Sequence, residues 1–378
     1  MLENSLVPAN EIWYTTTDGK TIKGCMDTPK KSNTYKKDGK GVIVFQEPVV
    51  EIGEKAFYGC STLQEIVIPE GVTKIGKGAF YLCESLQEIV ISEGVTTIGE
   101  RAFFRCKSLQ EIVIPEGVTE IGIGAFSYCH SLQKIVIPEG VTEIGGGAFS
   151  ECGSLQKIVI PEGVTEIGES AFSYCGSLCK IVIPSSVTEI GDNAFENCTG
   201  LQEIIIPEGI RWIGDYAFFG CTSLQKVVIP SSVTEIGYNA FGRCVGLEEI
   251  VIPEGVTRIE DNAFNGCASL QKIVIPSSVT EIGEESFATC NSLISIVIPE
   301  GVTSIGGRAF RDCESLKSIT IPASVKSIGI MAFDWCESLK SITFQGTVAE
   351  WEEIELVDDW NYKVPTSVIH CSDGDAEL

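Results

Sequence analysis

Apolar residues recur along this chain with a fixed period of 23 residues. An isoleucine opens each period and is followed by glycine, except at Ile259, which is followed by Glu260. The thirteen isoleucines are Ile52, Ile75, Ile98, Ile121, Ile144, Ile167, Ile190, Ile213, Ile236, Ile259, Ile282, Ile305 and Ile328. No insertion interrupts the steps, and an ordinary globular domain does not keep such a register. The pattern therefore predicts a solenoid in which each period forms one coil.

The polar and apolar positions within one period predict three local structures. Residues 132–137 (LQKIVI) alternate as a strand that turns its leucine and isoleucines inward. Pro138 ends this strand because proline cannot donate to a ladder, and residues 141–144 (VTEI) form a second short extended segment. The A-F-x-x-C segment at 148–152 has the spacing of a short helical or 3₁₀ turn. A single coil cannot bury its own apolar face, so stacking supplies the core and both ends need caps.

The repeated unit resembles a known family. The unit L-x-x-I-x-I-P-x-x-V-T-x-I-G-x-x-A-F-x-x-C, from Ile52 to about Gly346, is similar to the BspA-like class of bacterial leucine-rich repeats. The resemblance implies a leucine-rich-repeat solenoid of thirteen coils with a long parallel sheet. Members of that class are typically secreted or attached to the cell surface and are implicated in adhesion to host or neighbouring cells. Residues 1–5 show no basic region followed by an apolar core, so no signal peptide is visible and a cytoplasmic location is the alternative.

The segments that flank the repeats predict a cap at each end. Residues 11–20 indicate a hairpin with an Asp-Gly turn, and residues 37–45 indicate a second one, which together cover the open edge of the first coil. After the last repeat, Thr347 is expected to cap a short helix that carries Trp351 and Ile354. The chain therefore divides into an N-terminal β-hairpin cap (1–51), the repeat solenoid (52–346) and a C-terminal cap with an acidic tail (347–378).

The overall charge excludes two classes of partner. The chain carries 52 acidic and 27 basic residues, a formal net charge of −25. A surface this acidic repels phosphate backbones and anionic lipid headgroups, which argues against nucleic-acid binding and a membrane-surface role. The sequence also contains no apolar run of about 18 residues, so no insertion into a membrane is expected.

Cysteine is the first candidate for chemistry, because the chain has sixteen. Thirteen share one register: Cys60, Cys83, Cys106, Cys129, Cys152, Cys175, Cys198, Cys221, Cys244, Cys267, Cys290, Cys313 and Cys336. A metal array or a disulfide chain is the alternative, but an odd ladder without C-x-x-C spacing favours buried free thiols that act as small apolar groups. Cys25, Cys179 and Cys371 lie outside the ladder, and Cys179 stands where most coils have glutamine. We expect Cys179 to be exposed and to be the reactive thiol.

Other catalytic and metal-binding patterns are weak. The chain has two histidines, His130 and His370, which cannot build a triad or a three-histidine zinc site. The stripe of Glu120, Glu143, Glu166 and Glu189 is interpreted as solvated charge rather than a calcium site, because no calcium-loop pattern accompanies it. The glycines form neither a P-loop nor a dinucleotide fingerprint. No catalytic residue, metal or cofactor is therefore predicted.

One outward row of β-branched residues follows the predicted sheet. It runs through Val67, Val90, Val113, Val136, Val159, Val182, Ile205, Val228, Val251, Val274 and Val297 to Thr320 and Thr343. Two readings stay open: long apolar strips mark interaction sites, and β-branched residues simply favour a pleated surface. The neighbouring outward row changes from Glu65, Glu88 and Glu111 to Lys134, Lys157 and Lys180, and then mixes both signs. Mixed charge beside an apolar strip suits recognition of a protein or peptide.

The coil that opens at Ile213 departs most from the repeat. Arg211 and Trp212 replace the common Thr and Glu, and Tyr216 and Phe219 add aromatic rings nearby. This composition resembles that of binding hot spots, so we hypothesise an exposed patch. Further aromatics recur at Tyr58, Tyr81, Phe104, Tyr128, Tyr174, Tyr238 and Trp335. Most of these are interpreted as packing over neighbouring coils.

Three functions follow from these patterns. The first is non-catalytic binding of a protein or glycan at a bacterial surface through the sheet face, as the resemblance implies. The second is a structural scaffold that self-associates weakly through the valine row. The third and least favoured is a hydrolase or redox protein that uses a cysteine. Fold alone names no ligand.

Overall fold

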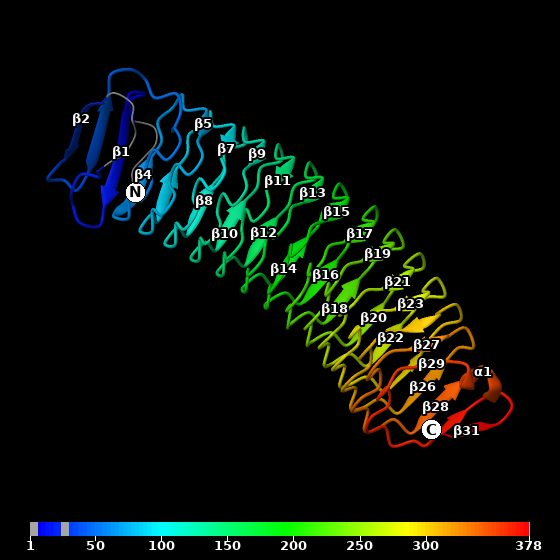
Figure 1. Cartoon of the computed structure of the whole chain (residues 1–378). Coiled ribbons are helices and arrows are strands. Elements are labelled where there is room, and N and C mark those ends of the chain that lie inside the picture. The colour runs from blue at the N-terminus through cyan, green and yellow to red at the C-terminus, as the bar shows by residue number, and fades with distance from the viewer. Residues whose placement is uncertain (1–6, 24–29, 378) are drawn as a thin grey trace. The chain divides into compact units, whose positions relative to one another are not determined.

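The chain forms a solenoid, as the 23-residue period predicts (Figure 1). The computed structural model describes residues 7–23 and 30–377. The chain divides into two compact units, Met1–Val187 and Thr188–Leu378. Each unit is a stack of 23-residue coils, with an N-terminal cap in the first and a C-terminal cap in the second.

Each coil of the first unit contributes one strand to each of two parallel layers. The L-x-x-I-x-I segment supplies the front sheet: β4 (Leu63–Val67), β6 (Glu88–Val90), β8 (Glu111–Val113), β10 (Lys134–Val136), β12 (Lys157–Val159) and β14 (Lys180–Val182). The V-T-x-I segment supplies the rear sheet: β5 (Lys74–Ile75), β7 (Thr97–Ile98), β9 (Glu120–Ile121), β11 (Glu143–Ile144) and β13 (Glu166–Ile167). Equivalent residues of neighbouring coils are in register, so Lys134 lies beside Glu111 and Val136 lies beside Val113. The front ladder is interrupted between β6 and β8.

The second unit repeats the same two layers. Its front strands are β16 (Glu203–Ile205), β18 (Lys226–Val228), β20 (Glu249–Val251), β22 (Lys272–Val274), β24 (Ser295–Val297), β26 (Ser318–Ile321) and β28 (Ser341–Phe344). Its rear strands are β15 (Glu189–Ile190), β17 (Trp212–Ile213), β19 (Glu235–Ile236), β21 (Arg258–Ile259), β23 (Glu281–Ile282), β25 (Ser304–Ile305), β27 (Ser327–Ile328) and β29 (Glu355–Leu356). The ladders of this unit are interrupted between β22 and β24 and between β19 and β21.

The A-F-x-x-C segment is not the short helical or 3₁₀ turn that its spacing predicts. It is a run of β-turns, in which the amide of Ala148 donates to Gly145 and that of Cys152 donates to Phe149. The amides between them donate to the next coil, as that of Phe149 does to Ala171 over 2.9 Å. A helix would use these amides within its own turn. The β-turns leave every second amide free to join neighbouring coils.

Phenylalanine rings and cysteine thiols fill the core beside these turns. In the first unit the rings stack from Phe57 to Phe172, with neighbouring centroids 5.1 to 5.6 Å apart. Each thiol from Cys83 to Cys175 donates a hydrogen bond to the phenylalanine carbonyl of the preceding coil, at sulfur–oxygen distances of 3.0 to 3.3 Å. Cysteine at this register is therefore a buried donor as well as a space-filling apolar group. The second unit continues the pattern from Phe195 to Phe333.

The N-terminal cap contains one of the two predicted hairpins. β2 (Lys30–Tyr35) and β3 (Gly41–Phe45) pair antiparallel around residues 36–40. The hairpin predicted at 11–20 is wrong, because residues 21–23 form no strand after the Asp18–Gly19 turn. β1 (Glu11–Thr16) pairs instead with β3 on one side and with β4 of the first coil on the other. This pairing covers the edge of the first coil.

The C-terminal cap covers the end of the phenylalanine stack. Thr347 caps α1 (Val348–Glu352), as predicted, and forms a capping box with Glu350. The helix carries Trp351 but ends before Ile354. Trp351 and Trp360 are buried with their ring centroids 5.9 Å apart, and Trp360 lies edge-on against Phe333. The acidic tail is part of this cap, because β31 (Asp375–Glu377) pairs antiparallel with β30 (Val368–His370).

Glycine after the recurring isoleucine allows the coils to approach each other. A Cβ atom at Gly145 would lie 2.6 Å from the amide nitrogen of Ile123 and 2.8 Å from the carbonyl carbon of Gly122. In the second unit Glu260 stands at this position. Its rear strand β21 is the one that does not pair with the preceding strand β19. A side chain at this position therefore coincides with a broken ladder.

We expect Gly145→Ala to destabilise the protein by about 1–3 kcal/mol, because the added methyl group overpacks against backbone that cannot move without breaking the stack. Gly153→Ala is the matched control, since a Cβ atom there would meet no heavy atom within 4 Å. Thermal unfolding followed by circular dichroism checks both variants. Equal melting temperatures for the two would contradict the close-approach argument.

The buried thiols predict a loss of stability in alkaline solution. Burial raises the pKa of the Cys129 thiol from its ordinary value of 9.0 to about 12, and does the same at Cys267. Above pH 9 the unfolded chain releases these protons while the folded chain keeps them. The stabilisation is thus complete below pH 9 and is lost as the pH rises toward 12. Melting temperatures measured between about pH 8 and about pH 11 should fall less steeply for Cys129→Ser/Cys267→Ser than for the parent. Parallel curves would contradict this.

Candidate functional site

The front sheet of the first unit presents an apolar row beside a charged row. Its strands alternate, so Ile135 is buried while Lys134 and Val136 on either side are exposed. The side chains of the apolar row are more than half exposed: Val113 76%, Val136 55%, Val159 53% and Val182 62%. Lys134, Lys157 and Lys180 are also exposed. We call these four valines, the charged residues beside them, and Glu88 and Val90 on the preceding strand β6 the front face.

The apolar row is shorter than the sequence predicts. Val67 is 1% exposed and packs with Val7. Trp13, which lies opposite Val67 on β1, also packs there, as does the half-buried Val90. The N-terminal cap therefore covers Val67 fully and Val90 in part, and the fully exposed part of the row begins at Val113. In the second unit the row is exposed from Ile205 to Val297.

The charged row changes sign between two adjacent strands. Glu65 faces Glu88 across β4 and β6, whereas Glu111 faces Lys134 across β8 and β10. Lys134 in turn faces Lys157, and Lys157 faces Lys180. The first unit therefore carries an acidic block and a basic block on one face, in the same register as the valines.

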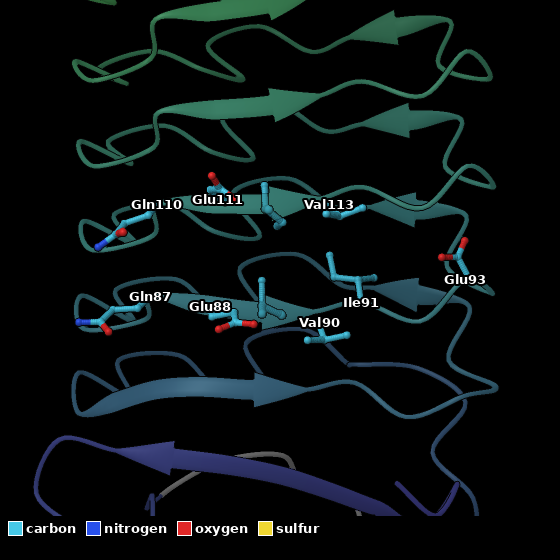
Figure 2. Close-up of a pocket in the computed structure, with 10 residues that line it drawn as sticks. Gln87, Glu88, Val90, Ile91, Glu93, Gln110, Glu111 and Val113 are labelled. Carbon is cyan, nitrogen blue, oxygen red and sulfur yellow. The ribbon is translucent and has the colours of Figure 1, made fainter. Parts of the chain in front are cut away.

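A hollow of about 460 Å³ opens on this face where the ladder is interrupted between β6 and β8. Figure 2 shows Glu88 and Glu111 on the two strands, beside Val90 and Val113. Sequence reasoning missed this hollow. The nearest departure from the repeat is Ser92, which replaces the usual proline and donates a hydrogen bond to the Val72 carbonyl.

The four residues of the predicted aromatic patch separate into two places. Tyr216 and Phe219 contact each other with ring centroids 5.6 Å apart. Arg211 and the half-buried Trp212 line a hollow of about 500 Å³ on the rear sheet. Within residues 7–23 and 30–377, Trp212 makes no ring contact with Tyr216 or Phe219. Trp212 lies on strand β17, whereas Tyr216 and Phe219 lie in the turns that follow it. A ligand role for either place stays a prediction.

Two residues outside the predicted patch pack against Tyr216 and Phe219. The Tyr238 ring lies 5.2 Å from that of Tyr216, and the Arg243 guanidinium lies 5.5 Å over the Phe219 ring. Tyr238 follows Tyr216 by 22 residues and Arg243 follows Phe219 by 24, close to the period of the repeat, and this spacing was the available signal. In the first unit, Tyr58, Tyr81 and Phe104 stack face to face. Their ring faces cover one another, which supports the interpretation that they pack across coils.

The remaining candidates for chemistry are dispersed. Cys179 is exposed, as expected, whereas Cys371 is half-buried and Cys25 lies outside the described residues. His130 Nδ1 bonds the Glu151 carbonyl over 2.9 Å, and His370 Nδ1 bonds Asp375 over 3.0 Å. Among residues 7–23 and 30–377, no three His, Cys, Asp or Glu side chains converge as metal ligands. In that same part of the chain, no helix is long and apolar enough to cross a bilayer.

Comparisons with known proteins place these features in a family. The family model described as BspA type Leucine rich repeat region matches residues 31–155, 142–270 and 257–355. A search of curated proteins gave no match.

Solved structures agree with the family match. A leucine-rich repeat protein from Bacteroides ovatus is 31% identical, aligned over 96% of this chain and 99% of its own, with a TM-score of 0.68. A leucine rich cell surface protein from Faecalibacterium prausnitzii is 30% identical, aligned over 93% and 97%, with a TM-score of 0.53. The pneumococcal vaccine antigen PcpA, 21% identical over 88% and 86% with a TM-score of 0.58, shares the fold. The chain belongs to the BspA-type leucine-rich-repeat family.

Proposed function

We propose that this chain is a non-catalytic adhesion protein of the bacterial cell surface and that its front face binds another protein. The observation that carries the proposal is the exposed row of Val113, Val136, Val159 and Val182. Contiguous apolar surface of this kind marks interaction sites on soluble proteins. The 30% identity to a cell surface protein supports the location.

The charges beside the valines favour a protein over a glycan as the ligand of this face. An apolar centre with a charged rim is the usual anatomy of a protein–protein interface. The charges contribute mainly to register and to the rate of encounter, while the valines supply buried apolar area. The face offers no exposed aromatic ring of its own among β8, β10, β12 and β14.

We expect the fluorescently tagged full chain to bind cultured epithelial cells or intact bacterial cells, measured by flow cytometry. Val136→Asp/Val159→Asp should weaken this binding by at least about tenfold, because it places unpaired charge at the centre of the interface. Ile123→Asp is the matched control, since Ile123 is 59% exposed but lies outside the front face.

Treatment of the cells separates the two ligand classes. Protease treatment should abolish binding, whereas binding that survives protease and is lost on enzymatic removal of glycans would indicate a glycan ligand. The proposal fails if the parent chain binds neither cell type. It also fails if Val136→Asp/Val159→Asp binds as strongly as the parent does.

A further inference from the structure

The charged row of the first unit is acidic toward one end and basic toward the other. Two such rows in opposite directions therefore pair each glutamate with a lysine. Counted along the stack, Glu88 and Glu111 precede Lys134 and Lys157, all four at equivalent positions of successive coils. Glu111, Lys134 and Lys157 are exposed and Glu88 is half-buried. Within residues 7–23 and 30–377, none of the four takes part in an ion pair. These charges are therefore available to a partner.

We propose that the partner of the front face is a second copy of this chain, docked antiparallel about a two-fold axis that runs along the strands between β8 and β10. This inference rests on the proposed binding role of that face. The axis reverses the order of coils and keeps the strand direction. Glu111 then faces Lys134 of the second copy, and Glu88 faces Lys157 of the second copy. The same operation sets Val113 opposite Val136 of the second copy and the half-buried Val90 opposite Val159 of the second copy.

The hollow between β6 and β8 fits this arrangement. It lies on the acidic half of the face, and Glu88 and Glu111 are among its lining residues (Figure 2). Under the two-fold axis, Lys134 and Lys157 of the second copy stand over it. A lysine side chain can bury its methylene groups against Val90 and Val113 while its ammonium group meets a carboxylate. The hollow thus offers space to the side chains that the symmetry brings there.

Other two-fold arrangements of the same face are unfavourable. An axis that runs along the stack keeps the order of coils. If this axis lies over the charged row, each charged residue meets the same residue of the second copy. If it lies between the two rows, the charged row lies on the valine row of the second copy. Like charges in contact repel, and a charge buried on an apolar row has no partner. The antiparallel docking avoids both.

The face is small, so the dimer is weak. Four strands about 4.8 Å apart cover much less than the roughly 1,600 Å² of a standard interface. Weak interfaces of this size dissociate at concentrations on the order of micromolar.

A charge-swap experiment tests the proposal with purified full chains. One variant carries Lys134→Glu/Lys157→Glu and the other carries Glu88→Lys/Glu111→Lys. Sedimentation from roughly 1 to 200 µM should show the parent moving from 40.8 kDa toward twice that mass. Each variant alone should dimerise at least about tenfold more weakly, because like charges then face each other. An equimolar mixture of the two should dimerise as the parent does, since every pair is again opposite in sign.

The control is Glu120→Lys/Glu143→Lys, which makes the same change of net charge as Glu88→Lys/Glu111→Lys, but on exposed residues of the rear sheet. It should dimerise as the parent does. Three results would overturn the inference: a parent that stays at 40.8 kDa throughout, variants that dimerise as the parent does, or a mixture that stays monomeric. A monomeric parent that still binds cells would remove this inference alone and leave the proposed function standing. Circular dichroism of each variant confirms that the loss is not one of folding.

Discussion

The structure depends on the requirement that each coil bury its apolar face against the next. No coil has a core of its own, so the phenylalanine rings, the thiol hydrogen bonds and the turn amides all connect one coil to another. Each contact requires the same residue at the same place in successive coils. An insertion of one residue would shift the Phe149 ring, the Cys152 thiol and the Gly145 approach together. This explains why the 23-residue period is kept without interruption.

The same requirement leaves the outward positions free to differ between coils. Lys134 and Glu111 occupy equivalent places with opposite charge, and neither disturbs the ladder that joins β8 to β10. Inward positions therefore determine the fold, whereas outward positions can differ between coils without disturbing it. Where a departure falls on an inward or close-approach position, the stack changes, as it does at Glu260, where β21 does not pair with β19.

Sequence alone predicted what the period determines and missed what depends on non-repeating contacts. The coils, the strand of residues 134–136 and the buried cysteines follow from inward and outward alternation. The β-turns at 148–152 were missed because their spacing matches that of a helix, and only the hydrogen bonds between coils distinguish them. The covering of Val67 depends on Val7, which lies sixty residues away in the sequence. Trp212 was grouped with Tyr216 by sequence proximity, although the end of β17 separates a strand position from a turn position.

A repetitive face has a particular difficulty in recognising any partner. The valine row looks the same after a shift of one coil, so apolar burial alone would permit several registers. The sign change between Glu111 and Lys134 removes that degeneracy. If the antiparallel pair slips by one coil, either Glu111 meets Glu111 or Lys134 meets Lys134 on the two-fold axis, and repulsion opposes the slipped register. On this account the valines supply the affinity of the face, and its charges select both the register and the partner.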